Sequence, residues 1–228
     1  MSGITADITG QFLESVVVGR LREALAEGRL PLTEIGGRRI GSPIVRPSAV
    51  ICIGMIYAAH AAESRSLPPT VPIMFLKPPN TVVGPNDDVA IPRANTKTDW
   101  EIELRAVISR RALYLDAPAD SIGHIAGFVV ANDLSEREFQ LELSVGQWSK
   151  GKSAPGFNPT SPWLVIPDEV DHRALRLRSW VNGESRSLAG FRTCARETCA
   201  SSRSTDSAAN ASSSCNRTAR ACAMRRLC

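Results

Sequence analysis

The sequence predicts an α+β fold that is mostly β-strand, and three observations indicate it. Helical periodicity is confined mainly to residues 11–28, near the N-terminus. Short apolar or alternating segments, separated by stretches rich in Gly and Pro, then continue to about residue 190. Near the end of this region, Asn182-Gly183 is a dipeptide that favours a tight β-hairpin turn. The 228 residues are enough for one large domain with a small appendage.

The expected elements follow from local patterns along the chain. In the N-terminal helix, Phe12, Val16, Leu21 and Leu25 recur roughly at helical spacing, and Gly28 suits its end. Strands are expected at 50–57, 73–77, 100–109, 125–131, 161–167 and 175–181, where apolar residues run or alternate. Short helical segments are expected at 58–64, 118–126 and 135–143.

The chain divides into three parts. Residues 1–47 are expected to form a small helical lead-in, 48–190 the main domain, and 191–228 a disordered or aberrant tail. Residues 192–228 contain no aromatic side chain and one branched aliphatic, Leu227, so burial cannot offset the entropy of ordering them. A native disordered tail is one interpretation. An altered reading frame is favoured, because Arg, Ala, Ser and Cys accumulate there without periodicity.

Composition excludes several classes of partner. The formal charge is only +4, and no dense Lys/Arg block is interleaved with aromatics, so nucleic acid is not expected to bind. No apolar run approaches the ~18 residues of a membrane span, and the N-terminus lacks a signal-peptide pattern. Five of the six cysteines follow residue 190 at spacings that suit neither a disulfide framework nor zinc. We therefore expect a cytoplasmic protein with a small-molecule ligand.

The most informative segment is acidic. On a strand, Asp99, Glu101 and Glu103 share one face and Trp100 shares the other with Ile102. If the acidic face is exposed, the pattern is a solvated edge. If it is buried, a cation must lie against it, because neighbouring carboxylates repel each other.

Another acid follows a second apolar strand. Asp133 comes at the end of the run 125–131, where it is either a helix N-cap or a ligand. Three carboxylates without Cys or His suit a hard cation. Mg²⁺ or Mn²⁺ would take Glu101, Glu103 and Asp133.

Two further groups of residues suggest acid–base chemistry and anion binding. His60 and Glu63 are one helical turn apart, so they form either a catalytic pair or a surface pair. The positions of Arg137 and Gln140 place them on one face of a helix starting near Asp133, and Lys152 lies in a Gly-flanked stretch. Arg, Gln and Lys could hold a carboxylate or a developing oxyanion, or they are solvated surface residues.

Taken in order, these segments resemble the fumarylacetoacetate hydrolase family, over roughly residues 40–187. The matching segments are GMIYAAHAAE (54–63), PIMFLKPPNTVVGP (72–85), DWEIELRAVISR (99–110), GFVVANDLSEREFQ (127–140), WSKGKSAPGFNPTSPWLV (148–165) and VNGE (181–184). The family also holds acylpyruvate hydrolases, oxaloacetate decarboxylases and hydroxymuconate-type isomerases. The segments SEREFQ and KGK are similar to those of bacterial members that act on 2,4-diketo or 2-hydroxydienoate acids.

The resemblance implies a mixed β-sandwich roll, C-terminally incomplete here, that forms a homodimer and binds one Mg²⁺ or Mn²⁺. It implies that Glu101, Glu103 and Asp133 are the metal ligands. It also implies catalytic roles for His60, Glu63 and Lys152, and substrate binding by Tyr57, Lys77, Arg137 and Gln140. The implied reaction is hydrolysis of a carbon–carbon bond in a 2,4-diketo acid such as an acylpyruvate or fumarylpyruvate.

Departures from the family pattern keep other functions open. Ile56 replaces an Asn, 154–156 replaces a small–Asp–Thr segment, and Ser161 stands where Gly is usual. The late Gly-Thr-Pro segment of the family is not found after VNGE. The alternatives are a decarboxylase or isomerase using the same site, a binding module for small carboxylates, and an inactive truncated remnant.

Overall fold

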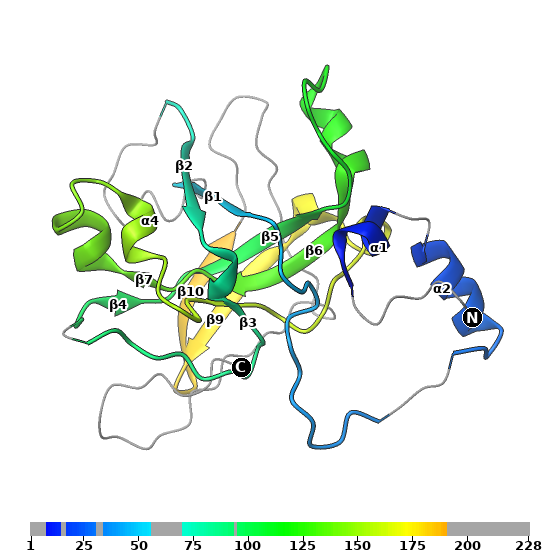
Figure 1. Ribbon diagram of the computed structural model, residues 1–228, viewed down its shortest axis with the longest axis horizontal. Coiled ribbons are helices and arrows are strands. Elements are labelled where there is room, and N and C mark those ends of the chain that lie inside the picture. Colours follow the sequence, from blue (N-terminus) through cyan, green and yellow to red (C-terminus); the bar gives the residue numbers. More distant parts are fainter. Residues whose placement is uncertain (1–7, 15–16, 31–33, 56–69, 94, 191–228) are drawn as a thin grey trace.

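A computed structural model describes residues 8–14, 17–30, 34–55, 70–93 and 95–190 (Figure 1). In this part of the chain, strands in small two-stranded sheets outnumber the short helices, which confirms the expected α+β, mostly β class. The expected helix at 58–64 and the tail at 191–228 lie outside the described residues. No helix in the described ranges has the length and apolar character of a membrane span.

The helix predicted at 11–28 is described in two parts, on either side of residues 15–16, which lie outside the described residues. α1 covers Gly10–Glu14 and α2 covers Val17–Ala26. The predicted end of this region is correct, since Gly28 adopts a φ of +67° and its N–H donates to the carbonyl of Leu25 at 3.0 Å. Glycine adopts this left-handed conformation without steric cost, which is why it ends helices.

Strand β1 (Val50–Gly54) pairs antiparallel with β2 (Ile73–Lys77). Both strands were expected, and β1 is shorter than predicted because Met55 turns the chain with a φ of 60°. The register places Val50 opposite Lys77 and Cys52 opposite Phe75. Those four side chains therefore share the inner face of the pair, where Val50, Phe75 and Lys77 are buried.

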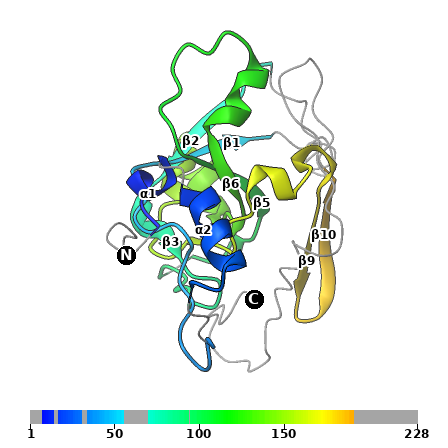
Figure 2. The same cartoon turned by 90° about the vertical axis from the view of Figure 1, so that its right-hand side faces the viewer.

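The centre of the fold is the antiparallel pair β5 (Ile102–Ile108) and β6 (Ile125–Asn132), joined through a 3₁₀ segment at Pro118–His124. The pair crosses the middle of both views (Figures 1 and 2). The strand predicted at 100–109 is observed as β5, which begins two residues later, and β4 (Thr98–Asp99) pairs separately with β7 (Ser135–Glu136). Trp100 and Glu101 lie between the two pairings and belong to neither strand.

The predicted helix at 135–143 is wrong at its start. Ser135 and Glu136 form β7, and only Glu138–Glu142 is helical, as a π-helix. Both β7 side chains are buried, and the carboxylate of Glu136 accepts hydrogen bonds from the N–H groups of Lys97 and Phe139. The contact with Lys97, which is distant in sequence, and the pairing with β4 favour the strand over the local helical pattern. Helix α4 (Trp148–Gly151) follows and packs against the π-helix.

The remaining strands form two more pairs. β3 (Val82–Val83), which follows a 3₁₀ turn at Pro79–Thr81, pairs in parallel with β8 (Asn158–Pro159). The strand expected at 161–167 is not formed. Val165 makes one isolated bridge to Phe128, and Pro162, with no N–H to donate, limits further pairing.

The C-terminal hairpin was predicted correctly. β9 (Arg176–Val181) and β10 (Glu184–Gly190) are joined at Asn182 and Gly183, whose φ angles are 55° and 82°. Positive φ at both positions is the requirement of a type I′ turn. Two short 3₁₀ segments, Pro167–Glu169 and His172–Ala174, precede it. Figure 2 shows this hairpin along one side of the molecule, beside the β5–β6 pair.

Two small apolar clusters flank the central pair. One is Leu175 and Leu177, packed against Ile102, Leu104 and Val130. The other is Val89, Leu134 and Phe157, packed against Val83 and Trp100. Between the clusters the interior is polar, and Lys77 and Lys152 are among the largest side chains that are fully buried. Buried lysines require acidic partners, and these lie at the ends of β5 and β6.

Candidate active site

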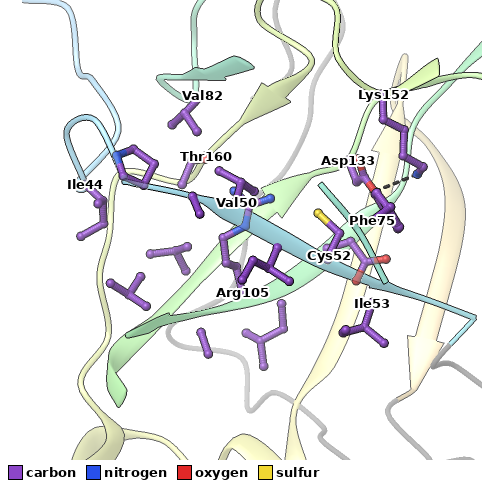
Figure 3. Close-up of a pocket in the computed structure, with 18 of the residues that line it drawn as sticks. Ile44, Val50, Cys52, Ile53, Phe75, Val82, Arg105, Asp133, Lys152 and Thr160 are labelled. Atoms are coloured by element: carbon purple, nitrogen blue, oxygen red, sulfur yellow. Dashed lines mark hydrogen bonds and ion pairs between the residues drawn. The ribbon is translucent and has the colours of Figure 1, made fainter. Parts of the chain in front are cut away.

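Lys152 joins two of the acids that the sequence singled out. Its Nζ donates to Glu101 Oε2 at 2.6 Å, to Asp133 Oδ2 at 2.8 Å and to the hydroxyl of Ser135 at 2.7 Å. Its side chain is 2% exposed. Glu101 follows β4 and Asp133 follows β6, and the N–H of Asp133 donates to the carbonyl of Glu101 at 2.8 Å. The backbone therefore holds the two carboxylates together around one positive charge, and Figure 3 shows the Asp133–Lys152 part of this contact.

A second buried lysine holds the other oxygen of Asp133. Lys77 Nζ donates to Asp133 Oδ1 and also to the carbonyl of Leu134 at 3.0 Å. Asp133 is thus fixed between two ammonium groups and does not cap a helix. Lys77 was expected to bind substrate, but it is not among the residues that line the cavity described below. In this structure its contacts orient Asp133.

Arg137 provides the third cation. Its Nη2 donates to Asp99 Oδ2 and Glu101 Oε1, both at 2.7 Å, and its Nη1 donates to Gln140 Oε1 at 2.8 Å. Asp99 and Glu101 therefore lie on one face, as the strand alternation predicted. The cations that a buried acidic face requires are Lys152 and Arg137. Arg137 and Gln140 also face one another as expected, although their helix begins after Glu136.

The two lysines differ in their charge balance. Burial alone would lower the pKa of Lys152, but the charges of Asp133 and Glu101 outweigh it and raise the pKa above that of an ordinary lysine. For Lys77, the Asp133 charge raises the pKa, but burial has the larger effect and lowers the pKa to about 8. The difference follows from the number of carboxylates, since Lys152 contacts two and Lys77 contacts one.

The pKa of Glu101 departs strongly from that of an ordinary glutamate. Burial alone would raise its pKa, but the charges and hydrogen bonds of Lys152 and Arg137 outweigh burial and lower the pKa to about 2. Glu101 is therefore ionised and Lys152 protonated at neutral pH. The site holds an ammonium group, a proton donor, beside fixed negative charge.

Backbone contact at Gly151 brings Lys152 into place. A Cβ at this position would lie 2.5 Å from both the nitrogen of Gln140 and the carbonyl oxygen of Glu136. Only glycine lets α4 approach the π-helix so closely. On its other side, Lys152 Nζ lies 4.9 Å from the ring centre of Phe75, which packs against Trp148. The aromatic wall limits the solvent around the ammonium group.

These groups line one cavity of about 690 Å³. Its polar lining includes the predicted residues Glu101, Glu103, Asp133, Arg137, Gln140 and Lys152. Its apolar lining comes from β1, β5 and the segment 44–50, and Figure 3 shows Val50, Ile53, Phe75 and Ile44 around it. The predicted catalytic pair His60 and Glu63 and the predicted substrate-binding Tyr57 lie outside the described residues.

The donor set of this cavity suits a hard cation by its chemistry. Glu101, Glu103 and Asp133 contribute only carboxylate oxygens, and Lys152 shows that two of them converge on one positive charge. Within the described ranges, no three His, Cys, Asp or Glu side chains are arranged to hold a metal ion. A divalent ion shared by Glu101 and Asp133 would therefore require the Lys152 ammonium to move from between them.

Sequence reasoning missed three residues of the cavity region. Ser135 accepts a hydrogen bond from Lys152, and Cys52 lines the cavity with a thiol whose pKa burial, together with the charge of Asp133, raises to about 11. Arg105 lines the cavity as well. The signal for Arg105 was available, because it continues the alternation of Glu101 and Glu103 along β5. Ser135 and Cys52 carried no comparable signal.

Buried lysines among carboxylates at the end of a cavity, on an α+β scaffold, are typical of an enzyme active site. The family model for the fumarylacetoacetate (FAA) hydrolase C-terminal domain matches residues 49–196. The chain belongs to this family.

Similar proteins include both hydrolases and isomerases. A Burkholderia multivorans protein, provisionally named a hydrolase, is 42% identical over 184 residues, covering 80% of this chain and 64% of its own length. The crystal structure of 2-hydroxyhepta-2,4-diene-1,7-dioate isomerase from Mycobacterium marinum is similar at 34% identity and a TM-score of 0.57, covering 66% of this chain and 54% of that one.

A third similar protein is a fumarylacetoacetate hydrolase from Exiguobacterium antarcticum, at 30% identity and a TM-score of 0.56. The match covers 66% of this chain and 54% of the Exiguobacterium chain. The chain thus spans less than two thirds of the length of these relatives.

Proposed function

We propose that the protein hydrolyses a carbon–carbon bond of a 2,4-diketo acid of the acylpyruvate or fumarylpyruvate kind, with Mg²⁺ or Mn²⁺ as cofactor. The observation that carries the proposal is the Lys152 ammonium between Glu101 and Asp133, at the polar end of a cavity large enough for a small acid. Membership of the family supports it.

Glu101, Glu103 and Asp133 would hold the divalent ion. When bound, such an ion acts as a Lewis acid toward the 2-oxo acid and stabilises negative charge that develops beside the oxo group. Displacement of Lys152 from the two carboxylates leaves its ammonium free to face the substrate. Arg137 and Gln140 lie beside the same acids and would orient the substrate carboxylate.

The remaining steps belong to proton-transferring side chains. His60, oriented by Glu63, would take a proton from water, which attacks the carbonyl distal to the acid. The bond between the carbons then breaks, and its electron pair remains on the carbon next to the 2-oxo group. Lys152, which carries a proton at neutral pH, would supply the proton to that carbon. The products are two carboxylic acids, one of which is a 2-oxo acid.

A second candidate is isomerisation or decarboxylation at the same site. A protonated, buried Lys152 is a proton donor that requires no activated water, and its contacts all lie within the described residues. Similarity to the Mycobacterium marinum isomerase also favours this reaction. The two candidates share every residue except His60 and Glu63, which are needed only when water attacks.

The test is turnover of 2,4-dioxopentanoate by the full chain with Mg²⁺ present. We expect loss of the diketone absorbance with equal amounts of pyruvate and acetate formed, and no turnover after chelation of the metal. Glu101→Gln should weaken Mg²⁺ binding measured by calorimetry, whereas Glu142→Gln, on an exposed side chain, should not. Turnover that is unaffected by chelation would disprove the metal dependence.

His60→Ala separates the two reactions. It should spare Mg²⁺ binding and stop hydrolysis, while decarboxylation of oxaloacetate or isomerisation of a 2-hydroxydienoate should continue. A His60→Ala variant that hydrolyses 2,4-dioxopentanoate at the wild-type rate would remove His60 as the base.

A further inference from the structure

The cavity is longer than the group of reacting side chains at its polar end. Glu103 and Val107, both on β5, line it and share one face of the strand. Four residues of an antiparallel strand span about 13 Å, so the cavity extends about that far along β5. In Figure 3, Ile44 lies on the opposite side of the cavity from the Asp133–Lys152 pair. The proposed reaction therefore uses one end of an elongated cavity.

The opposite end, which we call the distal end, is apolar and combines segments that are far apart in sequence. It is lined by Leu13 of α1, by Ile44, Val45 and Pro47 before β1, and by Val107 and Ile108 of β5. Figure 1 shows α1 on the side of the β5–β6 pair away from α4, which immediately precedes Lys152. Arg46 also lines the cavity, but its side chain is exposed, so its charge stays hydrated. An apolar group at the distal end would leave water for mostly apolar contacts.

Between the two ends, Arg105 lines the cavity, but its charged group is held at the wall. Its Nη2 donates to Oδ1 of Asn158 at 2.7 Å. Asn158 is fully buried and is not among the residues that line the cavity, so the hydrogen bond holds the guanidinium against protein. The charges of Asp133 and Glu103 favour its positive form. The stem of Arg105 is apolar and can lie along a hydrocarbon chain.

We propose that the distal end binds an unbranched apolar acyl chain, so that the preferred substrate is a 2,4-dioxo monocarboxylic acid of about ten carbons. The inference rests on the proposed function, in which the carboxylate and the 2-oxo group bind at the polar end. Given carbon–carbon bonds of about 1.5 Å, an extended chain of ten carbons spans roughly 11 Å. This length fits within the spacing of about 13 Å between Glu103 and Val107. Val50 and Val129, both buried, add apolar side chains to the cavity wall.

Burial of the acyl chain sets the size of the expected preference. Each buried methylene contributes about fourfold in affinity, and 2,4-dioxodecanoate has five more methylenes than 2,4-dioxopentanoate. Val45 and Ile108 are 39% and 57% exposed, so the distal end is open and part of the chain stays hydrated. Burial of about half of the added methylenes predicts a preference of about 30-fold.

The test compares kcat/KM for these two acids, measured on the full chain with Mg²⁺ from the loss of diketone absorbance. Hydrolysis of 2,4-dioxodecanoate consumes one water and gives pyruvate and heptanoate. We expect the wild type to prefer 2,4-dioxodecanoate about 30-fold. Leu13→Asp, which places a charge at the distal end, should lower this ratio about tenfold or more, and Val107→Thr, which nearly keeps the shape, about threefold or more. Leu25→Asp, at an exposed position of α2 outside the cavity lining, should preserve it.

Each contrary result has a distinct meaning. Equal kcat/KM of the wild type for both acids overturns the inference without any variant, and it leaves the proposed function standing. A preference for 2,4-dioxodecanedioate over 2,4-dioxodecanoate also overturns it, because the distal end would then bind a charge. An unchanged ratio in both Leu13→Asp and Val107→Thr overturns it as well, since the acyl chain would lie elsewhere. A wild type that hydrolyses neither acid overturns the proposed function and the inference together.

Discussion

Lys152 Nζ lies 2.6 Å from Oε2 of Glu101, in a buried ion pair between residues 51 positions apart in sequence. The pair has two consequences for the chemistry of the site. It keeps a proton on the lysine and a negative charge on the acid. It also places a cation where a divalent ion would share the same carboxylate, so the lysine and the ion compete for Glu101.

The first prediction concerns this competition. Lys152→Met removes a positive charge from between Glu101 and Asp133, so Mg²⁺ should bind about tenfold or more tightly, as judged by calorimetry. Turnover of 2,4-dioxopentanoate should nevertheless fall about 100-fold or more, because the proton donor is lost. Tighter metal binding with lower activity distinguishes the lysine from a residue that merely supports the fold.

Lys150→Met is the matched control for this experiment. Lys150 lies on the same short helix, α4, but its side chain is exposed and lies 5.6 Å from the ring centre of Phe139. We expect it to change neither Mg²⁺ affinity nor turnover by more than about twofold. If Lys152→Met binds Mg²⁺ as the wild type does, the lysine and the ion do not occupy the same space.

The second prediction concerns Lys77, whose ion pair with Asp133 is fully buried. Lys77→Met should lower the free energy of unfolding by about 3 kcal/mol, because removal of one partner leaves part of a buried charge uncompensated. Denaturant unfolding followed by circular dichroism measures this change. Lys97→Met, which breaks an ion pair on the surface, should leave the unfolding midpoint unchanged.

A small effect of Lys77→Met would indicate that Lys152 alone balances the charge of Asp133. The KM for 2,4-dioxopentanoate, measured on the folded fraction, then reports whether Lys77 contacts substrate. We expect no direct effect on binding, because Lys77 is absent from the cavity lining.

Local signals in the sequence were sufficient for some elements. β2 was predicted with its observed bounds, and the Asn182-Gly183 turn was predicted with its hairpin, because strand alternation and turn chemistry depend only on neighbouring residues. The same holds for the shared face of Asp99 and Glu101. The spacing of two residues fixes that face once the segment is extended.

Pairing between distant segments could not be predicted in this way. Ser135 and Glu136 have a helical pattern around them, yet they pair with Thr98 and Asp99, more than thirty residues earlier. The strand expected around Val165 failed for the converse reason, since an apolar run without a full partner strand makes only one bridge. Tertiary contacts override local propensity in both cases.

The acids of the site were named from sequence, but the arrangement of the cations was not. The family resemblance implied that Lys77 and Lys152 both face the ligand. The structure places Lys77 behind Asp133 and Lys152 between two acids. Which lysine reaches which oxygen depends on the packing of β2 and α4, and that packing involves glycine contacts that carry no side-chain signal.

The third prediction tests one of these contacts. A methyl group at Gly151 would lie 2.5 Å from the backbone of both Gln140 and Glu136, so α4 must move away from the π-helix. Gly151→Ala should cost about 2 kcal/mol of stability and should also reduce turnover, because Lys152 is the next residue. Gly123→Ala is the matched control, since a Cβ there has no neighbour within 4 Å. Wild-type stability and activity in Gly151→Ala would contradict the close packing.

The fourth prediction is a pH dependence of stability at His172, whose ring stacks on Phe128 with 5.2 Å between ring centres. Burial, assisted by the charge of Arg173, lowers the pKa of His172 below 6.5. As pH falls below about 6.5, the unfolded chain takes up a proton before the folded protein does, so this contribution to stability is complete above that pH and is lost below it. His172→Phe keeps the ring and removes the proton site. The variant should therefore lose less stability than the wild type between pH 7 and pH 5, measured by urea unfolding. Parallel losses in the two proteins would show that His172 titrates alike in the folded and unfolded chains.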